Sequence, residues 1–255
     1  MGIIQGVDAA NALVVGASQG IGLGFVKALL QEATAAAVYA TYRRSETATE
    51  LLNLQTQHPR LTAIPMDLTD EGQIAKGLAS VSAVSPKLHL VINCVGMLHN
   101  ETQQPEKSLR QIDLDSLTRY FQVNSISAIL LIKHLQPMLR HGDRSVVATI
   151  SAKVGSIGDN RLGGWYGYRA SKAALNMLIH TAAIEYGRRC PQAILVALHP
   201  GTTDTQLSKP FQRNVPEGKL FPVEKTVGLL LGVIRGLEPA DSGEFFSWDG
   251  SRLPW

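Results

Sequence analysis

The stretch Ala12-Leu13-Val14-Val15-Gly16-Ala17-Ser18-Gln19-Gly20-Ile21-Gly22 predicts how this chain begins to fold. Four consecutive apolar residues are typical of a buried strand, and the amphipathic run from Ile21 to Gln31 is typical of a helix. Glycines between them let the chain turn sharply and bring its backbone close to a ligand, while the helix N-terminus attracts an anion. The spacing Gly-x-x-x-Gly-x-Gly differs from the standard dinucleotide fingerprint, and a tight turn without a ligand is the alternative interpretation.

Short apolar runs alternate with amphipathic stretches along the rest of the chain. We expect strands at 12–15, 36–41, 61–65, 88–93, 146–150, 193–199 and 244–247. We expect helices at 21–31, 46–57, 70–84, 109–140 and 224–236, and one that carries Tyr168 and Lys172 and runs to about 187. This order predicts an α/β fold with a parallel sheet covered by helices on both faces. The long irregular region at 201–222 is interpreted as a functional lid.

The composition narrows the class of protein. The 255 residues fit one large domain, and 45% apolar with only 18% charged residues argue against disorder. A net charge of +3 is too mild to predict a nucleic-acid partner but suits an anionic small molecule. Two cysteines form no disulfide framework, and no Cys/His spacing predicts a metal site. Without a secretory signal or a membrane-length apolar run, we expect a cytoplasmic protein with no membrane partner.

Tyr168 and Lys172 stand four residues apart in an expected helix. At that spacing two side chains emerge from one face, about 5–6 Å apart at Cβ. A neighbouring cation favours phenolate, so we expect the pKa of Tyr168 below its usual value of about 10. Such a tyrosine can exchange a proton with a substrate oxygen near neutral pH. Tyr166 is the competing tyrosine, but Ala170 stands four residues beyond it, so no lysine can activate it.

The residues after the second expected strand predict which nicotinamide cofactor is bound. Dinucleotide folds that prefer NAD place an acid there, about 20 residues beyond the glycine turn, to hold the ribose 2′-hydroxyl. This chain has Thr41-Tyr42-Arg43-Arg44 instead. Guanidiniums suit a 2′-phosphate through charge-assisted, bidentate hydrogen bonds. We therefore predict NADP(H), with a solvated basic loop as the alternative.

Further motifs follow in a fixed order: Asn93-Cys94-Val95-Gly96, then Asn124, Ser151, the Tyr168 and Lys172 pair, and Pro200-Gly201. Together with the glycine turn, they make nearly the whole chain resemble the short-chain dehydrogenase/reductase family. The stretch 163–172 and the ending Trp248-Asp249-Gly250 more narrowly resemble its C-factor/sniffer carbonyl reductase branch.

The resemblance implies a fold and a set of site residues. The fold is a single domain over 1–255, a Rossmann-type doubly wound parallel sheet with a cofactor half at about 1–150 and a catalytic and substrate half at about 151–255. Tyr168 would be the acid/base, Lys172 would hold the nicotinamide ribose, and Asn124 would anchor a water in a proton relay. The implied cofactor-binding residues are Gly16, Ser18, Gln19, Gly20, Ile21, Gly22, Arg43, Arg44, Asp67, Leu68, Asn93, Gly96, Pro200, Gly201, Thr203 and Thr205, with Thr202 as a further candidate.

The serine that orients the substrate oxygen departs from the family pattern. In many members it is the second of a Ser-Ser pair, and here that pair reads Ser151-Ala152. Neighbouring residues on an extended strand point to opposite faces, so Ser151 fills the role only if the strand flares at its end. Ser156 is the second candidate, and we favour Ser151. Val15, where a threonine is usual, and Cys94-Val95, where Asn-Ala is usual, concern structural hydrogen bonds.

Asn124 interrupts the apolar face of a long expected helix. A buried amide must find hydrogen-bond partners, so packing against backbone is the alternative to the relay role. The remaining polar candidates are interpreted as structural: four histidines lack a carboxylate spaced as a triad partner, and Cys94 reads as a small buried filler. These histidines are His99, His134, His180 and His199.

Our leading hypothesis is an NADP(H)-dependent oxidoreductase that transfers hydride between the nicotinamide and a carbonyl or alcohol substrate. An apolar wall would suit an apolar aldehyde or ketone; its candidates are Met97, Leu98, Trp165, Leu207 and Phe211. The alternative is a cofactor-binding signalling or regulatory module of the C-factor type with weak or vestigial catalysis. Epimerase or dehydratase chemistry is a weaker third hypothesis. The resemblance also implies a homodimer or homotetramer packed through the helices at 117–138 and 168–186.

Overall fold

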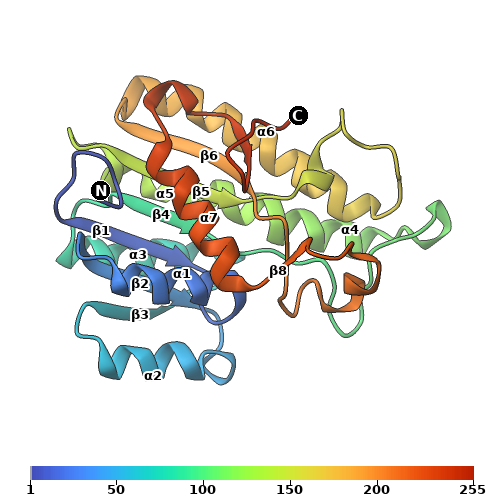
Figure 1. The fold of residues 1–255 in the computed structure, drawn as a ribbon, viewed down its shortest axis with the longest axis horizontal. Coiled ribbons are helices and arrows are strands. Elements are labelled where there is room, and N and C mark those ends of the chain that lie inside the picture. The colour runs from blue at the N-terminus through green and yellow to red at the C-terminus, as the bar shows by residue number, and fades with distance from the viewer. Residues whose placement is uncertain (1) are drawn as a thin grey trace.

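Seven parallel strands form one sheet through the centre of the protein (Figure 1). The computed structural model describes residues 2–255, except for the side chain of Asn214. The strand order is β3-β2-β1-β4-β5-β6-β9, which confirms the predicted doubly wound sheet. The strands are β1 (Ala10–Val15), β2 (Ala35–Tyr42), β3 (Leu61–Pro65), β4 (Leu90–Asn93), β5 (Ser145–Ile150), β6 (Ala193–His199) and β9 (Phe245–Ser247).

Helices cover both faces of this sheet. They are α1 (Gly20–Gln31), α2 (Thr49–Gln57), α3 (Glu71–Val84), α4 (Leu114–Phe121), α5 (Ser127–Leu139), α6 (Tyr166–Arg189) and α7 (Val223–Gly236). In Figure 1, α1 and α7 lie in front of the sheet and α3 and α5 lie behind it. Since successive strand residues alternate between faces, each face has its own apolar core.

The two cores divide the helices between them. One core joins the sheet to α1 and α7 through Phe25, Leu29 and Leu230. The other joins it to α3, α5 and α6 through Ile74, Leu131 and others. The central strands are therefore apolar on both faces, which is why they read in the sequence as continuous rather than alternating hydrophobic runs.

The expected helix at 109–140 is broken. A short 3₁₀ turn at Leu109–Gln111 comes first, and Asp113 then caps α4 by accepting a hydrogen bond from the Ser116 N–H at 2.9 Å. Between α4 and α5 the chain widens into a π-helical segment, Gln122–Ile126. The spacing of apolar residues did not predict the cap at Asp113 or the π-helical segment. The π-helical segment shifts the register of the helix by a fraction of a turn.

The expected lid at 201–222 has structure of its own. It contains a two-stranded parallel sheet, β7 (Thr202–Thr203) with β8 (Leu220–Phe221), and a 3₁₀ helix, Lys209–Asn214. The lid therefore follows α6 and β6 as a small folded unit rather than as a structureless loop. Within residues 2–255, no helix combines the length and apolar character that crossing a bilayer requires.

Candidate active site

The glycine turn after β1 brings two stretches of backbone into contact. Gly16 has φ 77°, and a Cβ there would lie 2.8 Å from Val95 Cγ2. A Cβ on Gly22 would overlap the Gly16 carbonyl oxygen. At the start of α1, Gln19 is the N-cap residue and no side chain caps the helix. The first-turn N–H groups are thus open to an anion, as a diphosphate site requires.

Thr41, at the end of β2, completes this turn and was missed by the sequence analysis. Its hydroxyl accepts a hydrogen bond from the Gly16 N–H at 3.1 Å, and its carbonyl oxygen accepts one from the Ala17 N–H at 2.8 Å. Val15 has no hydroxyl group to hydrogen-bond the turn, so a threonine on the neighbouring strand does so instead. Pairing between β1 and β2 brings it there, which no local pattern reveals.

The two arginines that follow β2 lie at the protein surface. Arg43 and Arg44 are both exposed, and within residues 2–255 neither guanidinium forms an ion pair or a side-chain hydrogen bond. Asp67, just beyond the end of β3, is half-buried, and its Oδ1 accepts hydrogen bonds from the N–H and hydroxyl of Thr69 at 2.9 and 2.8 Å. Leu68 is buried beside it.

The segment after β4 links the glycine turn to the helix that carries the tyrosine. Asn93 is buried, and its Oδ1 accepts a hydrogen bond from the Val95 N–H at 3.1 Å. A Cβ on Gly96 would lie 3.5 Å from Lys172 Nζ and 3.6 Å from Asn124 Oδ1. Gly96 therefore lies directly beside both the ammonium and the amide.

Tyr168 and Lys172 lie together beneath the carboxyl end of β5. Both are buried, and Lys172 Nζ is 6.0 Å from the centroid of the Tyr168 ring. The ammonium donates a hydrogen bond to the Ile150 carbonyl oxygen at 3.0 Å, which holds it at the sheet edge. The phenol ring packs edge-on against Tyr120 and Trp165, with centroids 6.3 and 6.2 Å away.

Burial changes the protonation of this pair. It raises the pKa of Tyr168, and Tyr120 adds to that rise. It also lowers the pKa of Lys172 to about 8. The predicted lowering of the tyrosine pKa is therefore wrong for the protein by itself, because burial disfavours the charged phenolate. Burial likewise raises the pKa of the Cys94 thiol, which suits a packing role.

Asn124 lies in the π-helical segment, and its side chain forms hydrogen bonds with the backbone of the segment after β4. Its Oδ1 accepts a hydrogen bond from the Met97 N–H at 2.7 Å, and its Nδ2 donates to the Met97 carbonyl at 2.9 Å. Nδ2 also donates to Ser171 Oγ at 3.0 Å, on the helix that carries the tyrosine. The amide thereby fixes three segments of the site, and its relay role remains a prediction.

Neither candidate serine directs its hydroxyl at the tyrosine. Ser151 is buried, and its Oγ donates a hydrogen bond to Asn176 Oδ1 at 2.6 Å, inside the core beneath α6. Ser156 Oγ donates to the Trp255 carbonyl at 3.3 Å and accepts from the Asp159 N–H at 3.1 Å. Ala152 packs into the apolar cluster around Tyr168 instead. The strand does not flare in the way that Ser151 would have needed.

The start of α6 is capped by a residue distant in sequence. Trp165 precedes the helix with φ 53°, and its N–H donates to the Glu106 carbonyl at 2.5 Å. Glu106 Oε2 accepts from the Gly167 N–H at 3.2 Å. A buried carboxylate at a helix N-terminus stabilises the helix through its dipole. Glu106 thus helps to position Tyr168, one residue after Gly167.

Gly167→Ala tests how closely this helix start is packed. A Cβ there would collide with Tyr120 Cδ2 and lie 2.8 Å from Glu106 Oε1. We expect Gly167→Ala to lower the free energy of unfolding, measured in urea, by about 1–3 kcal/mol. Gly187→Ala, in the same helix but with nothing within 4 Å, is the matched control and should leave stability unchanged or slightly raised. Equal effects from the two substitutions would contradict the packing described.

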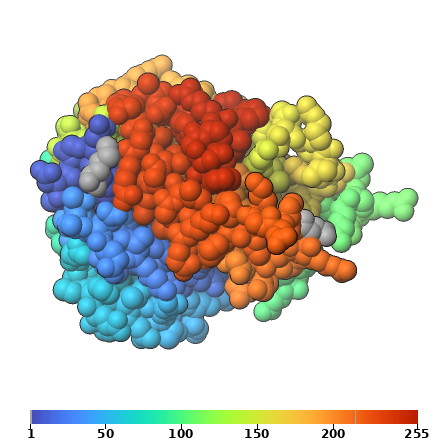
Figure 2. Space-filling view, in the orientation of Figure 1, coloured from blue at the N-terminus to red at the C-terminus, as the bar shows by residue number. Residues whose placement is uncertain are grey.

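The lid closes over the tyrosine through aromatic contacts. Phe211 packs edge-on against Trp165 with ring centroids 5.0 Å apart, and against His99 at 5.7 Å. His99 Nε2 also hydrogen-bonds the Gln206 carbonyl at 3.2 Å. In Figure 2 the orange atoms of the lid lie beside the yellow segment that leads into α6. Of the predicted wall residues, Met97, Leu98, Trp165 and Phe211 join the Tyr168 cluster, whereas Leu207 lies outside it.

The predicted cofactor residues beyond β6 have separate roles. Gly201 has φ 73° and is packed against Phe221 and Trp248. Thr203 is buried, and its hydroxyl hydrogen-bonds that of Thr226 at 2.8 Å, so it serves the packing of α7. Thr205 lies beside the glycine turn, 3.3 Å from where a Cβ on Gly20 would be. Of the two threonines, Thr205 fits a diphosphate contact better.

His199, at the end of β6, is the histidine most affected by its surroundings. Its Nδ1 is buried without a hydrogen-bond partner among the described residues. Burial lowers its pKa to about 4, and Lys153 adds to that lowering. The neutral form is therefore the one that the fold accommodates.

This shift predicts acid lability. Between the unfolded pKa of about 6.5 and the folded value of about 4, the unfolded chain binds the extra proton, so stability falls as the pH falls. As the pH falls through this window, the free energy of unfolding should fall less in His199→Gln than in wild type. The difference between the two proteins should be about 3 kcal/mol at most. Urea unfolding at several pH values measures this, and parallel curves for the two proteins would disprove it.

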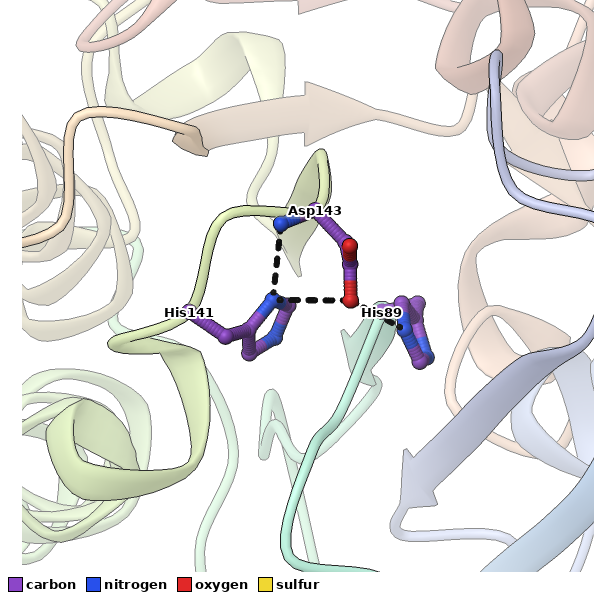
Figure 3. A group of neighbouring side chains, drawn as sticks. All are labelled: His89, His141 and Asp143. Atoms are coloured by element: carbon purple, nitrogen blue, oxygen red, sulfur yellow. Dashed lines mark hydrogen bonds and ion pairs between the residues drawn. The ribbon is translucent and has the colours of Figure 1, made fainter.

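His89, His141 and Asp143 form a second polar group, at the opposite end of the sheet (Figure 3). The potential ligand atoms of the three lie within 4.8 Å of one another, a proximity that sequence spacing does not reveal. However, His89 Nδ1 accepts a hydrogen bond from the Asn11 N–H at 3.0 Å, so its proton is on Nε2, the nitrogen that faces Asp143. Lys87 Nζ forms an ion pair with Asp143 Oδ2 at 2.9 Å. The group fits a satisfied polar network better than a metal site.

Known proteins that resemble this chain are short-chain dehydrogenases and carbonyl reductases. A sequence model described as short chain dehydrogenase matches residues 10–216. The C-signal of Myxococcus xanthus is 33% identical over 148 residues, which cover 58% of this chain and 84% of that protein. An NADPH-bound carbonyl reductase from chicken fatty liver is 32% identical with a TM-score of 0.87, over 97% of this chain and 99% of that one. The carbonyl reductase Sniffer of D. melanogaster is 25% identical with a TM-score of 0.86, over 97% and 100%.

Proposed function

The chain belongs to the short chain dehydrogenase family, and from that membership we propose that it is an NADP(H)-dependent oxidoreductase acting on a carbonyl or alcohol substrate. The observation that carries this proposal is the buried pair at the carboxyl end of β5, where Lys172 Nζ lies 6.0 Å from the Tyr168 ring. NADPH is bound by the carbonyl reductase from chicken fatty liver, whose fold this chain shares over nearly its whole length.

The residues present fit a nicotinamide dinucleotide phosphate. The uncapped start of α1 would hold the diphosphate, and Arg43 and Arg44 would hold the 2′-phosphate. Lys172 Nζ, which lies beside Gly96, would hold the nicotinamide ribose. When bound, this cofactor supplies or accepts the hydride.

The protein supplies the proton and the geometry. Tyr168 is protonated at neutral pH because burial raises its pKa, so it is ready to donate to the oxygen of a carbonyl being reduced. Lys172 stabilises the tyrosinate left behind, and Asn124 supports proton delivery from the solvent side. The apolar wall and the aromatic lid exclude water from the reacting carbon.

A screen of uncharged aldehydes and ketones, followed by the absorbance of NADPH, tests the proposal. Sustained NADPH oxidation that depends on the carbonyl compound is the expected result. Alcohols with NADP test the reverse direction. NADPH binding without turnover of any compound would instead favour a cofactor-binding signalling module, the alternative that the C-signal likeness keeps in view. The intact Tyr168 and Lys172 pair favours the enzyme.

We also propose a homodimer in a cytoplasmic setting. Apolar side chains lie exposed on α6 and on the π-helical segment beside it: Ile126, Met177 and Ile184 are 48%, 64% and 54% exposed. Pairing of these helices between two copies would cover them. Sedimentation should show a dimer in wild type and a shift towards monomer in Met177→Glu with Ile184→Glu, whereas a wild-type monomer at every concentration would refute it.

A further inference from the structure

Ser151 follows the last residue of β5 and is held from two sides. Its N–H donates a hydrogen bond to the Leu198 carbonyl oxygen of β6 at 2.8 Å. Its hydroxyl donates to Asn176 Oδ1 on α6 at 2.6 Å, and both residues are only 2% exposed. The residue after β5 is therefore fixed to the next strand by its backbone and to α6 by its side chain.

The peptide group between Ile150 and Ser151 connects this residue to Lys172. The N–H of this peptide group is the one that bonds β6, and its carbonyl oxygen, on Ile150, accepts the hydrogen bond from Lys172 Nζ at 3.0 Å. Among the described residues, no other atom accepts a hydrogen bond from this ammonium. An ammonium has three hydrogens, so the direction of this bond determines where the other two point.

Lys172 and Asn176 lie one turn apart on the same face of α6, because four residues separate them. The helix therefore meets the end of β5 at two adjacent residues: Lys172 donates to Ile150, and Asn176 accepts from Ser151. Asn176 Nδ2 is buried without a hydrogen-bond partner among the described residues. The Ser151 hydroxyl is thus the group that orients this amide, and loss of either partner leaves the other buried and unpaired.

We propose that Ser151 and Asn176 act as positioning residues, because their hydrogen bond fixes the peptide group whose carbonyl oxygen holds the Lys172 ammonium. The inference rests on the proposed function, in which Lys172 holds the nicotinamide ribose and stabilises the tyrosinate. It gives Ser151 a role other than orienting the substrate oxygen, since its hydroxyl is directed at Asn176. A displacement of about 1 Å in an active site can cost about 10²-fold in rate, so the direction of the ammonium matters.

Two variants separate this positioning role from a purely structural one. Ser151→Ala leaves the buried amide unpaired, so it should lower stability in urea. It should also lower kcat by about 10–10²-fold, with an unchanged KM for a carbonyl compound that wild type reduces. Ser151→Ala combined with Asn176→Leu replaces both partners by apolar groups, which should restore stability. Its kcat should stay as low as that of Ser151→Ala, because no side-chain hydrogen bond fixes the peptide group.

Ser85→Ala is the matched control at the other end of the sheet, since Ser85 precedes β4. This substitution removes a buried hydrogen bond of the same kind, between the hydroxyls of Ser85 and Tyr39 at 2.8 Å. We expect a loss of stability similar to that in Ser151→Ala, with the kcat of wild type.

A second readout requires neither cofactor nor turnover. The pKa of the Lys172 ammonium, measured by NMR in the protein without cofactor, should be about 8 in wild type. It should be lower in both variants that lack the Ser151 hydroxyl, because a loosened carbonyl oxygen favours the charged form less. Cys94 and Tyr168, which lie beside the ammonium, have raised pKa values and stay neutral during this titration. Ser85→Ala should give the wild-type value.

Two results would overturn the inference. One is a double variant with wild-type kcat and a wild-type pKa for Lys172, which would make the hydrogen bond purely structural. The other is an equal loss of kcat in Ser85→Ala, which would attribute the effect to reduced stability. Failure of the proposed function looks different: wild type reduces no carbonyl compound, while the pKa of Lys172 still falls in the two variants at Ser151 and supports the positioning role.

Discussion

Tyr168→Phe should lower kcat for carbonyl reduction by about 10³-fold while leaving NADPH affinity nearly unchanged. The substitution removes the proton donor and keeps the ring, whose edge-on contacts with Tyr120 and Trp165 hold it in place. No hydrogen bond from the phenol to another described residue is lost, so the fold should be unaffected. Single-turnover reduction with NADPH separates the chemical step from binding and release.

Tyr166→Phe is the matched control for this prediction. Tyr166 begins the same helix, but Ala170 stands where an activating lysine would have to be. We expect wild-type turnover from this variant. Retained turnover in Tyr168→Phe, or equal losses in the two variants, would reject Tyr168 as the acid. Loss of NADPH binding in Tyr168→Phe would show that the hydroxyl group holds the cofactor instead.

Arg43→Ala with Arg44→Ala should weaken NADP binding by at least about 100-fold and leave NAD binding unchanged. Each charge-assisted hydrogen bond contributes about 1.5–3 kcal/mol, and every 1.4 kcal/mol is tenfold in affinity. Both guanidiniums are exposed and free of ion pairs with described residues, so removing them should not disturb the fold.

The affinities for NADP and for NAD are measured by adding each cofactor to the protein and following the protein fluorescence. Arg188→Ala with Arg189→Ala removes two exposed guanidiniums from the far end of α6 and controls for the change in net charge. The separate Arg43→Ala and Arg44→Ala variants show which arginine contacts the phosphate. The assignment fails if the double variant binds NADP and NAD with the same ratio as wild type.

The family and the order of the main elements could be predicted from the sequence. The resemblance to the short-chain dehydrogenase/reductase family and its C-factor/sniffer branch is confirmed. Each main-sheet strand appears within a few residues of its expected position, because a strand buried on both faces must be apolar throughout. The glycine turn likewise encodes its own conformation, since few other residues adopt φ 77° at Gly16.

What the sequence could not reveal depends on which distant residues meet. Glu106 caps a helix that starts sixty residues later, and Thr41 secures a turn on the neighbouring strand. The protonation of Tyr168 follows from how deeply it is buried, which spacing to a lysine does not measure.

The sequence by itself determined the strand–turn–helix start, the alternating layers, and the presence of one tyrosine with a lysine on its helix face. Each of these is set by residues within a few positions of one another, through backbone sterics and periodicity. Only the tertiary structure decided that Ser151 faces the core and Ala152 the site, and that the phenol is held protonated. Those outcomes depend on the direction of side chains at a strand end and on exclusion of water, both of which arise when separate elements pack together.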